Sequence, residues 1–147
     1  MAGYKGHIAG SLLFCGLLYL FPFWKPLSMT GKIICVLLAV FFGLWPDVDT
    51  KSKGQHLFLL CVLIADILLI YREDYKRAAY LGLLIILPIM ARHRGWTHSA
   101  PAMILIPTGL YLAAFHYYQG SPMDLLPYFL ASLLGYASHL ILDRIKF

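Results

Sequence analysis

Long apolar runs divide the chain, and short clusters of charged residues separate them. The runs cover residues 8–24, 33–46, 54–71, 78–91, 99–118 and 125–142. A helix that spans a bilayer needs about 20 apolar residues, and the third, fifth and sixth runs come near that length. The second and fourth runs are shorter, but flanking lysines and arginines can snorkel and add a turn to each. The pattern predicts about six transmembrane helices, with five plus a re-entrant fourth segment as the alternative.

The same runs indicate the fold class. Lipid offers backbone groups no hydrogen-bond partner, so a spanning segment is either helical or part of a closed barrel. A barrel would show alternating polar and apolar positions, which these runs lack. The connecting segments are short and contain no Ser/Gly linker or repeat. We therefore predict one all-α integral-membrane domain over residues 1–147, a polytopic helical bundle whose first run is a retained helix rather than a cleaved signal.

Composition excludes several other classes of protein. The chain has 147 residues, of which 61% are hydrophobic and 13% charged, and its mean hydropathy is +0.74. A soluble domain averages about half apolar and about a quarter charged, so a soluble fold of this size could not bury this apolar surface. The net charge of +5 comes from short clusters between runs, which excludes a nucleic-acid module and leaves membrane lipid as the expected partner. The three cysteines lack zinc or disulfide spacing.

Alternating spans would gather most of the ionisable side chains with metal-binding chemistry at one membrane face. On the side of the N-terminus lie His7 and residues 46–49, 93–99 and 139–143. Four of the six histidines and three of the seven acidic residues thus share this face. Loop polarity without a function would be divided more evenly between the two faces. The topology therefore predicts a site on the N-terminal side.

Two pairs in this set have the spacing of metal ligands. His139 and Asp143 are four residues apart, so on a helix they share one face at about 6 Å between Cβ atoms. Such a pair can bind one ion, or the carboxylate can orient the imidazole; a snorkelling pair at a helix end is the alternative. Asp47 and Asp49 follow Pro46, where the second helix should stop, and can chelate or bridge cations. An ordinary Pro-Asp turn is the alternative there.

A third segment adds histidines and anion-binding groups. His93 and His98 flank a glycine turn, and Ser99 is predicted to cap the fifth helix. The positive end of that helix is a natural seat for a phosphate, and Arg92 and Arg94 provide forked donors for the same anion. The alternative is a capped, positively charged loop. Away from this face, Asp66 lies in the middle of the third run, where a carboxylate requires a partner or a proton.

Four motifs appear in a recognisable order: G-H at 6–7, L-W-P-D-V-D at 44–49, H-R-G-W-T-H-S at 93–99, and L-G-Y-A-S-H through the aspartate at 134–143. Together they resemble the YdjM-like family, LexA-regulated inner-membrane proteins of the SOS response described as metal-dependent hydrolases. The resemblance covers nearly the whole chain. It implies a membrane-embedded hydrolase that acts on phospholipid or a related membrane-associated ester. The ligand set is also distantly similar to those of zinc-dependent phospholipase C and P1 nuclease, an analogy that does not establish function.

The family motifs imply a set of metal ligands. These are His7, Asp47, Asp49, His93, His98, His139 and Asp143. The set suffices for one or two ions with water positions left over, and its imidazole and carboxylate groups suit zinc, with manganese or iron as alternatives. The expected chemistry is activation of water for attack on a phosphoester. The residues expected to act in that step are Asp49, His98, Arg94 and Ser99.

The chain departs from the family pattern at two places. Family members commonly have a histidine directly after the second aspartate of P-D-x-D, where this chain has Thr50. Many also continue past the last motif, whereas only residues 144–147 follow here. A candidate ligand and a candidate lid are therefore missing.

Two other functional classes remain open from the residues alone. One is a small cation or proton transporter or channel subunit, in which Asp66 would suit an ion or proton site at mid-depth. The lack of an inverted repeat argues against it. The other is a noncatalytic membrane adaptor whose metal ties helix ends together.

Localisation in the inner membrane of a bacterium is expected. The site face carries seven Lys and Arg residues against five on the other, so the positive-inside rule favours the cytoplasm; without Arg92 and Arg94 the counts are equal. The oligomeric state is not indicated.

Overall fold

Six α-helices make up most of a computed structural model that describes residues 3–49, 53–89, 96–118 and 120–144. They are α1 (Tyr4–Gly16), α2 (Met29–Leu44), α3 (Lys53–Tyr71), α4 (Tyr75–Ile89), α5 (Ala100–Tyr117) and α6 (Pro122–Arg144). Four short 3-10 helices join them: η1 (Leu17–Leu20), η2 (Pro22–Trp24), η3 (Trp45–Asp49) and η4 (Trp96–His98). The all-α class and the number of helices are as predicted, although α1 ends earlier than the first apolar run.

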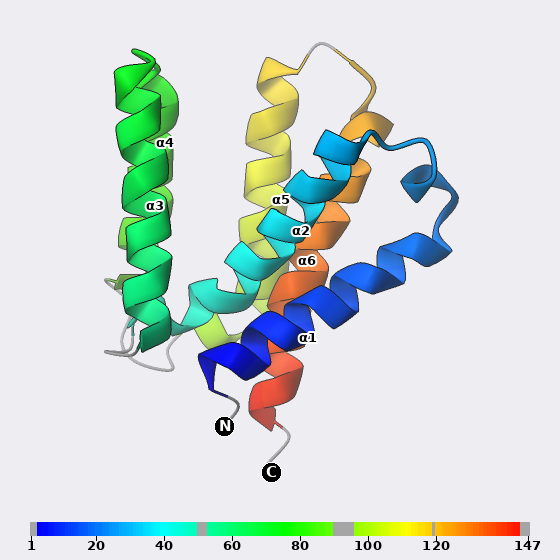
Figure 1. The fold of residues 1–147 in the computed structure, drawn as a ribbon, viewed down its shortest axis with the longest axis horizontal. Coiled ribbons are helices and arrows are strands. Elements are labelled where there is room, and N and C mark those ends of the chain that lie inside the picture. The colour runs from blue at the N-terminus through cyan, green and yellow to red at the C-terminus, as the bar shows by residue number, and fades with distance from the viewer. Residues whose placement is uncertain (1–2, 50–52, 90–95, 119, 145–147) are drawn as a thin grey trace.

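Three helical segments among the described residues are long and apolar enough to cross a membrane. They are Met29–Val48, Ala100–Tyr117 and Pro122–Arg144, and Gln55–Tyr71 is a shorter apolar helix. In Figure 1, α3 and α4 lie side by side as a pair that meets the other helices at its lower end and stands away from them at its upper end. Both chain termini lie at one end of the molecule, together with the start of α1 and the end of α6. These elements carry the predicted site residues.

Small residues line the faces on which α1, α2 and α6 pack together. In α2 and α6 they recur at every third or fourth position, as is common where membrane helices approach closely. The buried members include Gly10, Ser11 and Cys15 in α1, Cys35, Ala39 and Gly43 in α2, and Ala131, Gly135 and Ser138 in α6. A Cβ atom at Gly135 would collide with the carbonyl group of Ala39 and lie 2.7 Å from its Cα atom. The backbones of α2 and α6 are therefore in direct contact.

The segment η3 links this bundle to the α3–α4 pair. Pro46 lacks the N–H group that would continue α2, and the chain turns into the 3-10 helix at this point. Trp45 is fully buried, and its Nε1–H donates a hydrogen bond to the Leu84 carbonyl at 3.1 Å. That carbonyl is available because Pro88, four residues further along α4, has no N–H to donate to it. The tryptophan thus connects α4 to the residues next to Asp47.

The contact at Gly135 makes a direct prediction for stability. Gly135→Ala places a methyl group against the α2 backbone, and overpacking of this kind costs about 1–3 kcal/mol. The thermal melting temperature of the detergent-purified variant should fall by several degrees. Gly82→Ala is the control, because a Cβ atom there meets nothing within 4 Å and alanine favours the helix by up to about 1 kcal/mol. A Gly135→Ala variant as stable as the control would contradict the close approach.

Candidate metal centre

Four side chains from three elements converge at the end of the bundle where the termini lie. They are Asp47 from η3, His98 from η4, and His139 and Asp143 from α6. One nitrogen or carboxylate oxygen from each lies within 4.8 Å of the corresponding atoms of the others. His139 and Asp143 meet because they are four residues apart on one helix, as the sequence predicts. The other two come from segments 51 residues apart in the chain.

Five of the six distances between these atoms have the dimensions of a tetrahedral metal site. The Nε2 atoms of His98 and His139 lie 3.3 Å apart. Asp47 Oδ1 lies 3.3 Å from the His98 nitrogen and 3.6 Å from that of His139. Asp143 Oδ2 lies 3.6 and 3.5 Å from the same two nitrogens. Ligands at about 2.0–2.1 Å from a tetrahedral zinc ion lie about 3.3–3.4 Å from one another, so these five separations fit one ion.

The contact between His139 and the α2 backbone fixes which ring nitrogen can bind a metal. His139 Nδ1 lies 2.8 Å from the Gly43 carbonyl oxygen, and a carbonyl can only accept a hydrogen bond. Nδ1 therefore carries the proton in the neutral imidazole, and Nε2 presents its lone pair to the cluster. Gly43 lies in the last turn of α2, where carbonyl groups lack some of their intrahelical donors. Outer contacts of this kind are usual around metal-binding histidines.

His98 is positioned by a second buried network. The Tyr136 hydroxyl of α6 donates a 2.5 Å hydrogen bond to the Thr97 carbonyl, and both residues are fully buried. The Thr97 hydroxyl lies 3.3 Å from His98 Nδ1 and can accept its proton, which leaves Nε2 facing the cluster. The Trp45 ring packs against the Tyr136 ring with centroids 5.8 Å apart. One helix thus supplies two ligands and the anchor of a third.

His7 lies against the buried side of the cluster, beside His139. Its ring stacks on His139 with centroids 4.0 Å apart. Its Nε2 atom lies 3.6 Å from Asp47 Oδ2 and 3.5 Å from Asp143 Oδ1, the carboxylate oxygens that do not face His98. His7 therefore bridges the two carboxylates. It could orient both carboxylates, or take part in binding a second ion that they would share.

The cluster is buried on one side and open on another. The side chains of His139 and His7 are 0% and 1% exposed, whereas Asp47 is 29% exposed and Asp143 is 14% exposed. A small molecule could therefore reach an ion at this place past Asp47 rather than from the bundle core.

The structure places the remaining predicted residues as follows. Ser99 caps α5, as predicted: its hydroxyl accepts from the Ala102 N–H at 3.3 Å and donates to the Trp96 carbonyl at 2.5 Å. Its role with phosphate stays a prediction. Asp49 ends η3, but its side chain lies outside the described part, as do the predicted ligand His93 and the predicted phosphate-binding residue Arg94.

Sequence reasoning did not identify the supporting residues of the site. Gly43, Thr97 and Tyr136 position the ligands through backbone carbonyls or a hydroxyl, and none has ligand chemistry of its own. A signal for Gly43 was present, since it ends a series of small residues at every fourth position of α2, Gly31, Cys35 and Ala39. The contact between Tyr136 and Thr97 joins residues 39 apart and has no such local pattern.

Together, the fold and the site define a helical membrane protein with a His/Asp cluster able to hold a metal ion at one end of its bundle. Comparison with known families agrees with this class. The family described as YdjM inner membrane protein matches residues 1–146, and the chain belongs to it. Its name and the three long apolar helices support localisation in the inner membrane. No curated protein and no solved structure gives a significant match.

The anchoring of η4 by Tyr136 can be tested by removing one hydroxyl group. Tyr136→Phe leaves the buried Thr97 carbonyl without its donor, which costs about 1–3 kcal/mol. Loss of such an outer contact typically weakens metal binding by about 10- to 100-fold. Zinc affinity, measured by chelator competition, should fall by that factor. Tyr111→Phe also removes a hydroxyl that donates to a carbonyl, that of Pro122, but at the other end of α6, and should bind zinc like wild type. Equal zinc affinities for the two variants would contradict the anchoring role.

Proposed function

We propose that this protein is a membrane-embedded metal-dependent hydrolase that cleaves a phosphoester of a phospholipid or a related membrane-associated ester. The observation that carries the proposal is the convergence of two imidazole nitrogens and two carboxylate oxygens within 4.8 Å of one another at the end of the bundle.

The ligand types favour a catalytic over a structural ion, and the water that hydrolysis needs would bind as a fifth ligand, a coordination number that zinc can adopt. Structural zinc sites are rich in cysteine, whereas histidine and carboxylate ligands are typical of catalytic zinc. The three cysteines of this chain, Cys15, Cys35 and Cys61, are free thiols and do not belong to the cluster. Zinc is therefore the expected ion, with manganese and iron as alternatives for the same ligands.

The position of the cluster favours a lipid substrate. The two ligands from α6 lie near the C-terminal end of an apolar helix long enough to cross a membrane, and Asp47 lies just after α2, which is similarly apolar. The ends of such helices lie at the depth of lipid headgroups. A headgroup phosphate could approach past the partly exposed Asp47.

Individual residues have distinct roles in the proposed reaction. Asp47, His98, His139 and Asp143 would hold the ion, whose chemistry is to activate a water and polarise the phosphoester. The α5 helix begins directly after His98 and Ser99, so its positive N-terminal end can attract the phosphate. Arg94 would add donors to the same phosphate, and Asp49 would act on the attacking water. We place this face of the protein on the cytoplasmic side, as the positive-inside rule favours.

One observation favours a second candidate function, a small cation or proton transporter. Asp66 of α3 has a carboxylate oxygen, Oδ1, that is buried without a hydrogen-bond partner among the described residues. Ionisable groups within membrane helices commonly belong to ion or proton pathways. A protein that moves cations without consuming a lipid ester would fit this alternative.

Metal content tests the first part of the proposal. Mass spectrometry of the detergent-purified protein should find one or two equivalents of zinc, manganese or iron. His139→Ala combined with Asp143→Ala removes two ligands and should abolish binding. His116→Ala combined with Glu73→Ala also removes one imidazole and one carboxylate, at the opposite end of the molecule, and should retain the metal. Absence of metal from the reconstituted wild type would refute the metal site.

Hydrolysis separates an enzyme from a metal-stabilised adaptor and from a transporter. Metal-loaded protein in phospholipid vesicles should release phosphorylated headgroups or phosphatidate, detected by mass spectrometry. His98→Ala should lower the rate at least about a hundredfold, because loss of an outer contact alone costs up to about that factor. If the metal-loaded wild type turns over no phospholipid or related ester, the chain is an adaptor or a transporter instead. Metal-dependent cation flux in the same vesicles would identify the transporter.

A further inference from the structure

A deep cleft separates α4 from α5 away from the metal centre. Its volume is about 810 Å³, within the range of about 300–1,000 Å³ that is usual for ligand sites. Leucine and isoleucine side chains line it: Leu84 from α4 and Ile106 and Leu110 from α5 are half-buried, and Leu83 and Leu105 are exposed. The α5 helix begins at the metal centre, and residues of its later turns line the cleft. The end of the cleft beside the start of α4, here called its mouth, therefore lies away from the metal centre.

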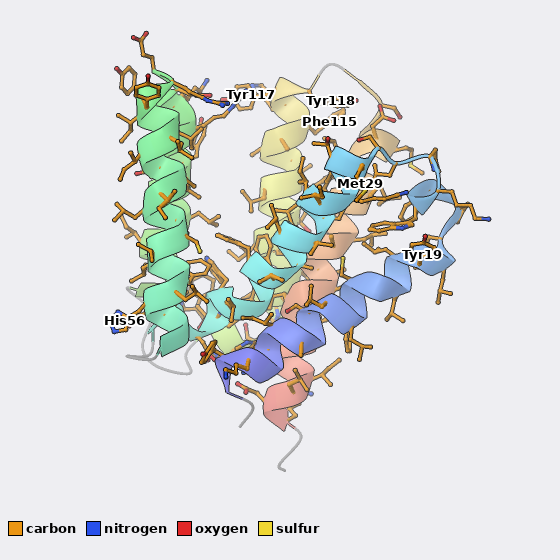
Figure 2. All side chains as sticks on the ribbon, viewed as in Figure 1. Tyr19, Met29, His56, Phe115, Tyr117 and Tyr118 are labelled. Atoms are coloured by element: carbon orange, nitrogen blue, oxygen red, sulfur yellow. The ribbon has the colours of Figure 1, made fainter. Side chains whose placement is uncertain are left out.

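Polar groups are concentrated at this mouth. The Lys76 ammonium of α4 lies 4.5 Å from the ring centroid of Tyr117 of α5, and the hydroxyls of Tyr80 and Tyr117 lie 3.2 Å apart. Figure 2 shows Tyr117 at the far end of α5, on the side toward α4. Arg77 is paired with Asp74 at 3.1 Å, whereas Lys76 forms no ion pair among the described residues. Lys76 is therefore a cation at the mouth that has no carboxylate partner of its own among the described residues.

These features match the parts of a lipid molecule. Acyl chains suit the apolar lining of the cleft, tyrosines suit the interfacial region, and a lysine at headgroup depth attracts a phosphate. We propose that this cleft binds one anionic phospholipid, with its phosphate at Lys76 and its acyl chains between α4 and α5. The bound lipid belongs to the leaflet opposite the metal centre, so its phosphate cannot reach the cluster. It is a structural lipid rather than the substrate.

The lipid would hold the α3–α4 pair against the rest of the bundle. Trp45 joins α4 to the site region through its hydrogen bond to the Leu84 carbonyl, and the Leu84 side chain lines the cleft. Acyl chains packed on Leu84 would support Trp45, which precedes Asp47 by two residues. The proposal does not depend on hydrolysis, because it rests on the cleft alone.

Two glycines offer a matched pair of variants. Gly109 lines the cleft and Gly82 does not, and a Cβ atom at either position meets nothing within 4 Å. Gly109→Phe should fill the cleft with little strain, and Gly82→Phe adds the same bulk elsewhere. Lys76→Gln removes the charge at the mouth, and Lys25→Gln removes an exposed cation outside the cleft as its control.

Native mass spectrometry of protein in micelles with equal phosphatidylglycerol and phosphatidylethanolamine tests the proposal. Wild type, Gly82→Phe and Lys25→Gln should retain one lipid per chain, with phosphatidylglycerol preferred. Gly109→Phe should lose it, and Lys76→Gln should lose about fivefold in that preference, the contribution of one lysine near an anionic lipid. Retention of the lipid by Gly109→Phe would overturn the proposal. So would a wild-type dimer that becomes a monomer in Gly109→Phe, because a second chain would then occupy the cleft.

Metal content of the same samples keeps this test separate from the proposed hydrolase. Wild type and Gly82→Phe should contain equal metal whether or not lipid is bound in the cleft. Loss of the lipid from Gly109→Phe with normal metal content supports the lipid site alone. A wild type without metal that still retains phosphatidylglycerol would refute the metal site and leave the lipid site standing.

Discussion

The metal-ligand cluster depends on how closely α2 and α6 approach each other. Their backbones touch at Gly135 and Ala39, which lie one helical turn before His139 and Gly43 respectively. Only at that separation can the imidazole of one helix reach a backbone carbonyl of the other. In lipid, where apolar side chains gain little from leaving the solvent, packing of small residues is a principal source of helix association. The residues that hold α2 and α6 together therefore also set the position of the ligand His139.

The hydrogen bond between His139 and Gly43 connects this packing to the chemistry of the site. Because the Gly43 carbonyl only accepts, this contact selects the tautomer in which Nδ1 donates its N–H and the Nε2 lone pair faces the cluster. Tyr136, on the same helix, places His98 through the Thr97 carbonyl. The α6 helix is thus the rigid element on which the site is built, and rigid elements hold ligand geometry better than loops do. The α3–α4 pair is attached to the rest of the bundle through η3, through Trp45, and through Phe58 of α3, which packs on Phe41 of α2 with ring centroids 4.8 Å apart.

Much of this arrangement could be predicted from the sequence because it follows from local rules. The apolar runs predicted the six helices. The alternation of their directions predicted that His7, Asp47, His98 and the His139/Asp143 pair lie at one end of the bundle. The order of the helices in space could not be predicted in this way. Contacts such as that between Tyr136 and Thr97 depend on the rotation of each helix about its axis, which charge patterns do not determine. The end of α1 at Gly16 was also not predicted, because the apolar run continues through η1 after the helix ends.

X-ray absorption spectroscopy of the zinc-loaded protein in detergent tests the central claim most directly. The arrangement predicts a shell of four or five nitrogen and oxygen ligands at about 2.0–2.1 Å, with the outer scattering of two imidazoles. It also predicts no sulfur at about 2.3 Å. A spectrum with sulfur ligands, or with a shell of water oxygens and no imidazole scattering, would contradict a metal site built from α6, η3 and η4.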